Sequence, residues 1–330
     1  MQQLKTLILW VTCAIIVLTI SSCNNNGNST DSSTHDNLIT DPPLRVARFT
    51  ASDIENILTS SAEGRSLLEL AGTPQCGFDV HYIEYVTHGA LGEETSATGA
   101  LMVPNGSTAP CGGARPIVLY AHGTNEVKTY NIAAILDASN AGYLESLRIA
   151  TMFAAQGYIV VAPNYAGYDT SPLPYHPYLN AEQQSQEMID SLTAARSALG
   201  GIPAAATTDD GRLFITGNSQ GGHVAMATQR ALQENDQTIT AVAPLSGPYA
   251  LEAMGDAVLT GSVNVGSTMF IPMIINSYQN AYGNVYSEVT DSYSSSYATG
   301  IESLLPGQPL ETLLTNGLPV CGRLRRPIPD

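Results

Sequence analysis

The spacing of hydrophobic residues changes along the chain, and each change predicts a different kind of element. Between residues 52 and 71 the apolar positions have helical spacing, and Ser52 is the expected N-cap of this helical segment. From residue 78 the period becomes two, which predicts strands over 78–89 and 96–104. A short acidic loop separates these strands, so we expect an antiparallel hairpin.

A repeated strand–helix order follows the hairpin. Four segments have the apolar character of buried strands, and three segments have helical spacing. The strands are predicted over 116–121, 158–163, 212–217 and 239–247, and the helices over 143–156, 181–199 and 219–234. This order predicts the α/β class: a mostly parallel central sheet with helices on both faces.

Residues 251–300 have a different character, rich in Tyr, Ser, Asn and Gly. Their tyrosines recur at helical spacing, which allows two interpretations. One is an amphipathic surface helix docked by its aromatic stripe, and the other is a lid whose tyrosines line an acyl or aromatic pocket. The tyrosines concerned are Tyr278, Tyr282, Tyr286, Tyr293 and Tyr297.

The amino-acid composition of the chain excludes some classes of protein and of partner. The chain of 330 residues has 44% hydrophobic residues, which excludes wholesale disorder. It carries 29 Asp and Glu against 13 Lys and Arg, a formal net charge of −16. A chain this acidic cannot neutralise many phosphates, so we expect no nucleic-acid partner.

The N-terminus predicts export. Lys5 precedes an uncharged run over residues 7–20 that is short for a membrane span. The run ends in Ile-Ser-Ser-Cys23, which resembles the lipobox of bacterial lipoproteins, and the alternative is an ordinary signal peptide with an incidental cysteine. We expect a signal peptide over 1–22 and a lipid anchor at Cys23 that binds the cell envelope. Asn24 favours the outer membrane.

A flexible tether over 23–44 would then lead to a core over 45–250, a cap-like segment over 251–318 and an irregular tail over 319–330. In an exported chain Cys76 and Cys111 could form a disulfide, which would leave Cys321 over. No cysteine or histidine cluster suggests a metal site.

The strongest chemical motif is Gly217-Asn-Ser219-Gln220-Gly221. It stands where a predicted strand passes into a predicted helix, the context that a nucleophile elbow requires. Gly217 and Gly221 supply the small neighbours of a sharp turn, and Ser219 would stand at a helix N-terminus, where negative charge is stabilised. The alternative is an ordinary capped start of a helix.

Three segments together resemble the α/β-hydrolase superfamily: YAHGT at 120–124, AAQGYIVVAPNYAGY at 154–168 and ITGNSQGGHVAMAT at 215–228. The chain is most similar to exported bacterial lipases and esterases related to the secretory lipase group. The resemblance covers about residues 45–250 and continues less specifically to about 318. It implies ester hydrolysis through an acyl-enzyme on Ser219, with neither cofactor nor metal.

The same resemblance implies an oxyanion hole. Its two donors would be the backbone N–H groups of Thr124 and Gln220. Gly123 would keep the backbone open, and His122 is interpreted as a structural residue that orients this loop. The loop over 164–169 would lie beside the active site.

The triad is incomplete by comparison with the superfamily, which places its acid and histidine after the serine. Only His223 follows Ser219, one helical turn later, and we interpret it as a packed side chain beneath the turn. The triad acid and histidine therefore stay unassigned. The residues considered and not assigned are Asp256, Asp291, His88 and His176.

The last residues raise a further expectation. Three arginines crowd residues 323–326, and the tail has no strand or helix pattern. We expect that the sequence is truncated, or shifted out of frame, before the last two strands of the fold. The sheet would then end at the strand over 239–247 with an exposed apolar edge.

Three functions follow from these observations. The first is a serine carboxylester hydrolase at the cell envelope that acts on a small-molecule or lipid ester. The second is a serine peptidase of the prolyl-oligopeptidase type, although no propeller is present in the sequence. The third is an inactive hydrolase-fold lipoprotein.

Overall fold

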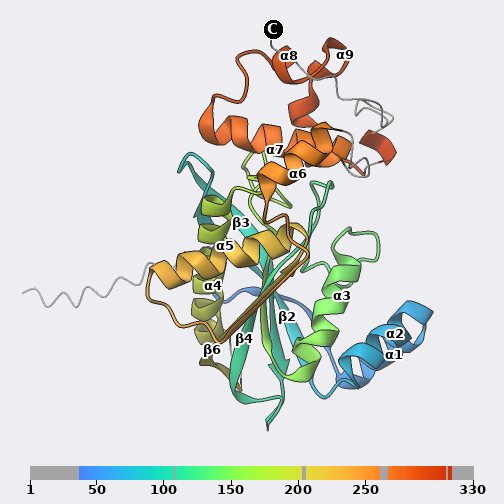
Figure 1. Cartoon of the computed structure of the whole chain (residues 1–330). Helices are drawn as coiled ribbons and strands as arrows, with labels where there is room; N and C mark the ends of the chain where they lie inside the picture. Colours follow the sequence, from blue (N-terminus) through green and yellow to red (C-terminus); the bar gives the residue numbers. More distant parts are fainter. Residues whose placement is uncertain (1–36, 108, 203–205, 261–266, 310, 314–330) are drawn as a thin grey trace, which may run out of the picture. The chain divides into compact units, whose positions relative to one another are not determined.

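A computed structural model describes residues 37–107, 109–202, 206–260, 267–309 and 311–313 (Figure 1). The expected signal peptide, the lipidated Cys23, most of the tether and the tail with Cys321 lie outside these residues. Within the described ranges, no helix is both long and apolar enough to cross a membrane.

Seven strands form one mixed sheet in the order β1-β2-β3-β5-β4-β6-β7. Strands β5, β4, β6 and β7 are parallel to one another, and β1, β2 and β3 join them through antiparallel pairs. Five of the seven strands thus point in one direction, which confirms the predicted α/β class. The strands are β1 Leu44–Phe49, β2 Gly77–His88, β3 Glu94–Asn105, β4 Gly113–Ala121, β5 Ile159–Pro163, β6 Thr207–Asn218 and β7 Ala241–Leu245.

Helices cover both sides of this sheet. In Figure 1, α4 and α5 lie together on one side, and α3 lies on the other with α1 and α2 near it. The described helices are α1 Ala51–Thr59, α2 Ala62–Ala71, α3 Tyr143–Met152, α4 Ala181–Gly201, α5 Gln220–Glu234, α6 Leu251–Leu259, α7 Ser267–Tyr282, α8 Val289–Ser292 and α9 Ser295–Ala298.

The buried strands in the centre carry the core. Every residue of β5 is buried, and Ile117 of β4 pairs with Ile159 of β5 in parallel register. The hairpin of β2 and β3 is confirmed with unbroken register from Gly77 opposite Asn105 to His88 opposite Glu94. The sheet therefore brings the ends of β4, β5 and β6 to one edge.

The N-terminal part differs from the expectation. Residues 52–71 form two helices, and the N-cap of α1 is Thr50, not Ser52. The Thr50 side chain accepts a hydrogen bond from the backbone N–H of Asp53, whose carboxylate accepts one from the backbone N–H of Thr50. Strand β1 was not predicted, because its sequence LRVARF is short and carries two exposed arginines.

The residues before β1 also contact the sheet. The backbone N–H of Ile39 donates to the carbonyl of Glu84, and the N–H of Val86 donates to the carbonyl of Asn37. The described chain therefore lies along β2 from Asn37 onward, inside the range expected to be a tether.

The tyrosines after residue 250 do not lie on one helix. Helix α7 ends at Tyr282, and Gly283 follows with φ of 66°, so the helical spacing stops there. A second hydrophobic cluster nevertheless forms between this segment and residues 178–179. It contains Tyr178, Leu179, Met269, Met273, Tyr293, Ile301, Leu305 and Leu313.

Strand β7 stands at the edge of the sheet. In the described part of the chain it pairs only with β6, and its residues alternate between exposed and half-buried. Leu245 is 54% exposed, and Tyr249 just after the strand is 53% exposed. The expected apolar edge is therefore present among the described residues.

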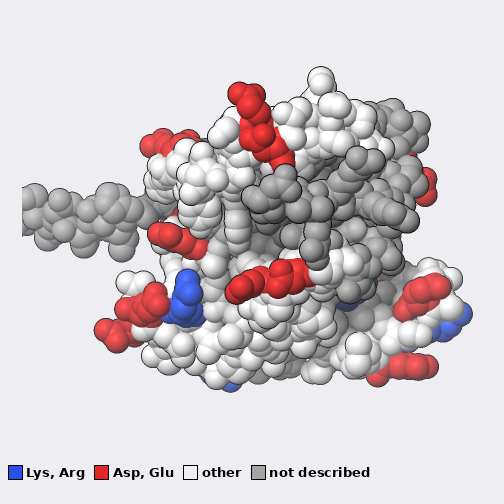
Figure 2. All heavy atoms as spheres, turned by 45° about the horizontal axis from the view of Figure 1, so that its top comes forward, with Lys and Arg blue, Asp and Glu red and all other residues white. Residues whose placement is uncertain are grey.

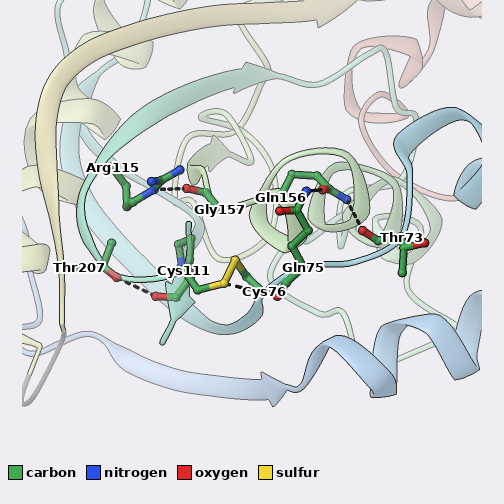
Figure 3. The surroundings of a disulfide bond; sticks show 9 residues. Thr73, Gln75, Cys76, Cys111, Arg115, Gln156, Gly157 and Thr207 are labelled. Carbon is green, nitrogen blue, oxygen red and sulfur yellow. Dashed lines mark hydrogen bonds between the residues drawn. A yellow bond between two sulfur atoms is a disulfide. The ribbon is translucent and has the colours of Figure 1, made fainter. Parts of the chain in front are cut away.

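A disulfide joins Cys76, just before β2, to Cys111, just before β4 (Figure 3). The backbone N–H groups of Gln75 and Cys76 both donate to the carbonyl of Ala155, so the same corner also holds the end of the α3 region. Beside the disulfide, the Arg115 guanidinium donates to the carbonyl of Gly157. The disulfide thus links two segments that hydrogen bonds already hold close together.

Helix α4 carries a buried carboxyl group against the loop after β5. Glu187 accepts a hydrogen bond from the backbone N–H of Ala166, and Gln183 Nε2 donates to its second oxygen at 3.0 Å. Burial raises the pKa of Glu187 to about 8, because a buried charge loses its hydration. The carboxyl is therefore protonated near neutral pH in the folded state.

The Cys76–Cys111 bond should contribute strongly to stability. It joins residues 35 apart, and the loss of loop entropy in the unfolded chain corresponds to about 3–4 kcal/mol. We expect the double variant Cys76→Ala/Cys111→Ala to lose about this free energy of unfolding in denaturant titrations. A reducing agent should lower the stability of the parent protein and leave the variant unchanged. Equal stability of the oxidised parent and the variant would contradict the prediction.

The free energy of unfolding should also depend on pH through the protonation of Glu187. The unfolded carboxyl titrates near its ordinary pKa of 4.5, whereas the folded one keeps its proton to about pH 8. The folded state thus binds more protons in this interval, so the free energy of unfolding falls as pH rises through it. Glu187→Gln should remove this part of the fall, whereas Glu182→Gln, at an exposed position of the same helix, should not. Parallel pH profiles for all three proteins would refute the assignment.

Candidate active site

Ser219 occupies a strained turn between β6 and α5. Its φ is 58° and its ψ is −121°, a region that non-glycine residues rarely adopt. Its backbone N–H donates to the carbonyl of Leu245 at the end of β7. The turn places a half-buried serine at the N-terminus of a fifteen-residue helix.

Two glycines permit this turn. A Cβ atom on Gly221 would lie 2.0 Å from the carbonyl oxygen of Ala121, and one on Gly217 would lie 2.5 Å from the same oxygen. Both positions therefore accept only hydrogen. The geometry is that of a sharp strand-to-helix elbow, at the position where the sequence predicts one.

The His122-Gly123-Thr124 segment lies against this elbow. Ala121 pairs with Gly217 at the ends of β4 and β6, and a Cβ on Gly123 would contact the carbonyl oxygen of Asn218 at 3.4 Å. The two segments implied to form an oxyanion hole are thus neighbours. The N–H groups of Gln220 and Thr124 have no hydrogen-bond partner among the described residues, so they are free to bind an oxygen atom.

His122 is fully buried beneath this loop. Its Nδ1 lies 2.6 Å from the carbonyl oxygen of Gly123, and its Nε2 lies 2.9 Å from that of Asn164. The ring stacks on Tyr165 with 4.0 Å between centroids. Burial lowers the pKa of His122 and so favours the neutral ring, which donates to one carbonyl at a time. These contacts orient the loop.

Within the described residues, His88, His176 and His223 form no hydrogen bond with the Ser219 hydroxyl. His223 lies one turn along α5, half-buried, and burial lowers its pKa. His88 is exposed at the end of β2. His176 is buried and bonded through both ring nitrogens. In the described part of the chain, the hydroxyl of Ser219 makes no hydrogen bond.

The acids considered from the sequence are also placed elsewhere. Asp291 accepts hydrogen bonds from the N–H groups of Ser287 and Glu288, which uses its carboxylate to cap α8. Asp256 is exposed on α6. Among the described residues, neither of these two carboxylates forms a hydrogen bond with Ser219.

Two half-buried carboxylates that the sequence did not indicate, Glu145 and Asp169, accept hydrogen bonds from hydroxyl groups of the core. Glu145 accepts hydrogen bonds from the hydroxyls of Tyr120 and Tyr130, at 2.6 and 2.9 Å. Asp169 accepts from Tyr82 and Thr98. Tyrosines spread over the sequence carry no pattern that could have revealed these contacts.

Metal ligands are not gathered at this site. Among the described residues, no three His, Cys, Asp or Glu side chains lie close enough together to hold an ion. The site offers a strained serine, a helix N-terminus and two backbone donors that no described residue binds. This arrangement suits attack on a carbonyl group whose oxygen becomes negative.

Comparison with known proteins gives a consistent result. The model of the prolyl oligopeptidase family matches residues 145–260, the part that contains β5, β6, the elbow and α5. No curated protein sequence gives a significant match.

The chain is similar to several solved structures. The rice cell wall degrading esterase LipA from Xanthomonas oryzae is 30% identical over 87% of this chain and 71% of its own, with a TM-score of 0.72. A ligand-bound form of that esterase is 31% identical, again with a TM-score of 0.72, over 85% and 69%.

A Legionella pneumophila protein at 23% identity shares the fold, with a TM-score of 0.70 over 86% of this chain and 71% of its own. The identity with the Xanthomonas oryzae esterase is high enough, over enough of both chains, to settle the family. The chain belongs to the α/β-hydrolase superfamily, in the family of the Xanthomonas oryzae esterase, and is a hydrolase of the esterase type.

Proposed function

We propose that the chain is a serine carboxylester hydrolase with Ser219 as its nucleophile. One observation carries this proposal: Ser219 is held at φ of 58° beside the N–H groups of Gln220 and Thr124, which have no hydrogen-bond partner in the described part of the chain. A strained serine costs free energy, and such strain persists where the surrounding structure holds it for a function.

The reaction follows from the positions of these groups. Ser219 Oγ attacks the ester carbonyl carbon, and its proton passes to a general base, for which no described residue is assigned. The carbonyl oxygen becomes an oxyanion and accepts hydrogen bonds from Gln220 and Thr124. The alcohol then leaves with a proton, and water releases the acid from the acyl-enzyme by the same steps.

The substrate class is a small-molecule or lipid ester. Figure 2 shows Asp and Glu spread over the visible face with few Lys or Arg, which disfavours polyanionic substrates. The low share of charged residues, 13%, supports an apolar acyl group. The solved relative is described as degrading rice cell wall, and we take from it only the ester class.

A peptidase is the second candidate, and the family match over 145–260 favours it. That range contains the strand, elbow and helix that serine hydrolases of this fold share, so it fits either activity. The whole-chain similarity to an esterase makes ester hydrolysis the better-supported function.

We also propose an exported protein that is anchored to the outer membrane by a lipid on Cys23. The support is the sequence Ile-Ser-Ser-Cys after an uncharged run, followed by a polar segment. The disulfide between Cys76 and Cys111 suits an oxidising compartment.

Substitution of the nucleophile tests the activity. Ser219→Ala should lower turnover of a p-nitrophenyl ester by at least about 10³-fold and abolish labelling by a fluorophosphonate, because it removes the proposed nucleophile. Ser303→Ala, an exposed serine, should change neither readout.

Three outcomes separate the alternatives. Ester turnover unaffected by Ser219→Ala would reject the nucleophile. Cleavage of a prolyl anilide without ester turnover would favour the peptidase. A folded protein without labelling or turnover would favour a non-enzymatic lipoprotein.

The anchor has its own test. Cys23→Ala should move the protein from the detergent phase to the aqueous phase in a phase-partition experiment, because it removes the site of lipidation. Cys13→Ala, within the expected signal peptide, should leave the partition unchanged. Recovery of the parent protein in the aqueous phase would contradict the proposed anchor.

A further inference from the structure

The loop over residues 171–180 lies between the turn that follows β5 and the start of α4. All of its residues except two prolines are buried, which is unusual for a connection. Two of its side chains, two residues apart, form hydrogen bonds to the two residues that would supply the oxyanion donors.

His176 is the first of these residues, and it is 2% exposed. Its Nδ1 lies 2.9 Å from the carbonyl oxygen of Ala166, which can only accept, so Nδ1 carries the proton. Burial lowers the pKa of His176 to about 3, which keeps the ring neutral. Its Nε2 therefore accepts a hydrogen bond from Gln220 Nε2 at 2.7 Å.

Tyr178 is the second residue, and it is 4% exposed. Its hydroxyl lies 2.7 Å from Thr124 Oγ1. The next residue, Leu179, has φ of 56°, and the N–H of Tyr178 donates to the carbonyl of His176. The backbone between these two side chains is therefore tightly turned.

The loop is also held from its other side. Tyr178 and Leu179 pack into the second hydrophobic cluster with Met269 and Met273 of α7. The hydroxyl of Tyr278, also in α7, donates to the carbonyl of Leu179 at 3.3 Å. The loop is thus a rigid element between α7 and the elbow.

We propose that His176 and Tyr178 are positioning residues of the oxyanion hole. Each holds the side chain of one donor residue, Gln220 or Thr124, so that the two N–H groups converge on one oxygen atom. This inference rests on the proposed function, because the hole acts only if Ser219 attacks an ester. Donors act in the transition state only when they are placed beforehand, and a misplacement of about 1 Å costs up to about 10²-fold in rate.

Matched variants separate positioning from folding. His176→Asn keeps a donor for the Ala166 carbonyl and loses the acceptor for Gln220, and His176→Gln restores an acceptor. Tyr178→Phe removes one hydroxyl. The control is Tyr175→Phe in the same loop, where the lost hydroxyl donates to Glu93 and accepts from the N–H of Ala90.

We expect His176→Asn and Tyr178→Phe each to lower kcat on a p-nitrophenyl ester by about 10-fold with KM unchanged. The reason is that the hydrogen bonds from the two N–H groups to the substrate oxygen strengthen only in the transition state. His176→Gln should recover part of the rate, and Tyr175→Phe should keep the parent kcat. The rate of fluorophosphonate labelling serves as the second readout and should follow kcat.

Two results would overturn the inference: parent kcat in both variants, or an equal loss in Tyr175→Phe, which would make the loop merely structural. Failure of the proposed function is recognised separately. In that case the parent and Ser219→Ala would have the same turnover and labelling before any loop variant is compared.

Discussion

Close contact between two backbone segments holds the turn at Ser219, and the arrangement of the site depends on this contact. The carbonyl oxygen of Ala121, at the end of β4, lies where side chains on Gly217 or Gly221 would have to stand. The end of β7 contributes as well, because the carbonyl of Leu245 accepts the N–H of Ser219. A backbone conformation that costs about 1–3 kcal/mol is therefore stable only when three neighbouring strands have paired.

The two buried histidines near the elbow, His122 and His176, are bonded to backbone carbonyls and to an amide side chain rather than to charged groups. His122 faces two carbonyl oxygens, and His176 joins the Ala166 carbonyl to Gln220. Neutral groups of this kind avoid the desolvation cost of a buried charge. Glu187 follows the same rule, because burial favours its protonated form. The site is thereby surrounded by fixed dipoles, which suit a charge that forms only during reaction.

Local patterns in the sequence were sufficient for six of the seven described strands. The hairpin, the buried strands and the helix after the elbow have periods that depend on neighbours in the chain, and all were predicted within a few residues. The errors lie where tertiary contacts outweigh local preference. Strand β1 forms because β2 offers a free edge, and the helical segment over 52–71 breaks at Ser60–Ser61 because Ser61 caps a second helix.

For the site, the sequence by itself determined the elbow, its two glycines and the adjacent His-Gly-Thr segment, because a sharp strand-to-helix turn needs those residue types at that spacing. Only the tertiary structure decided that Gln220 contacts His176 and that Thr124 contacts Tyr178. These pairs are 44 and 54 residues apart, and no periodicity links them. Their meeting depends on how a loop after β5 folds over the ends of β4 and β6, which is a property of the assembled sheet.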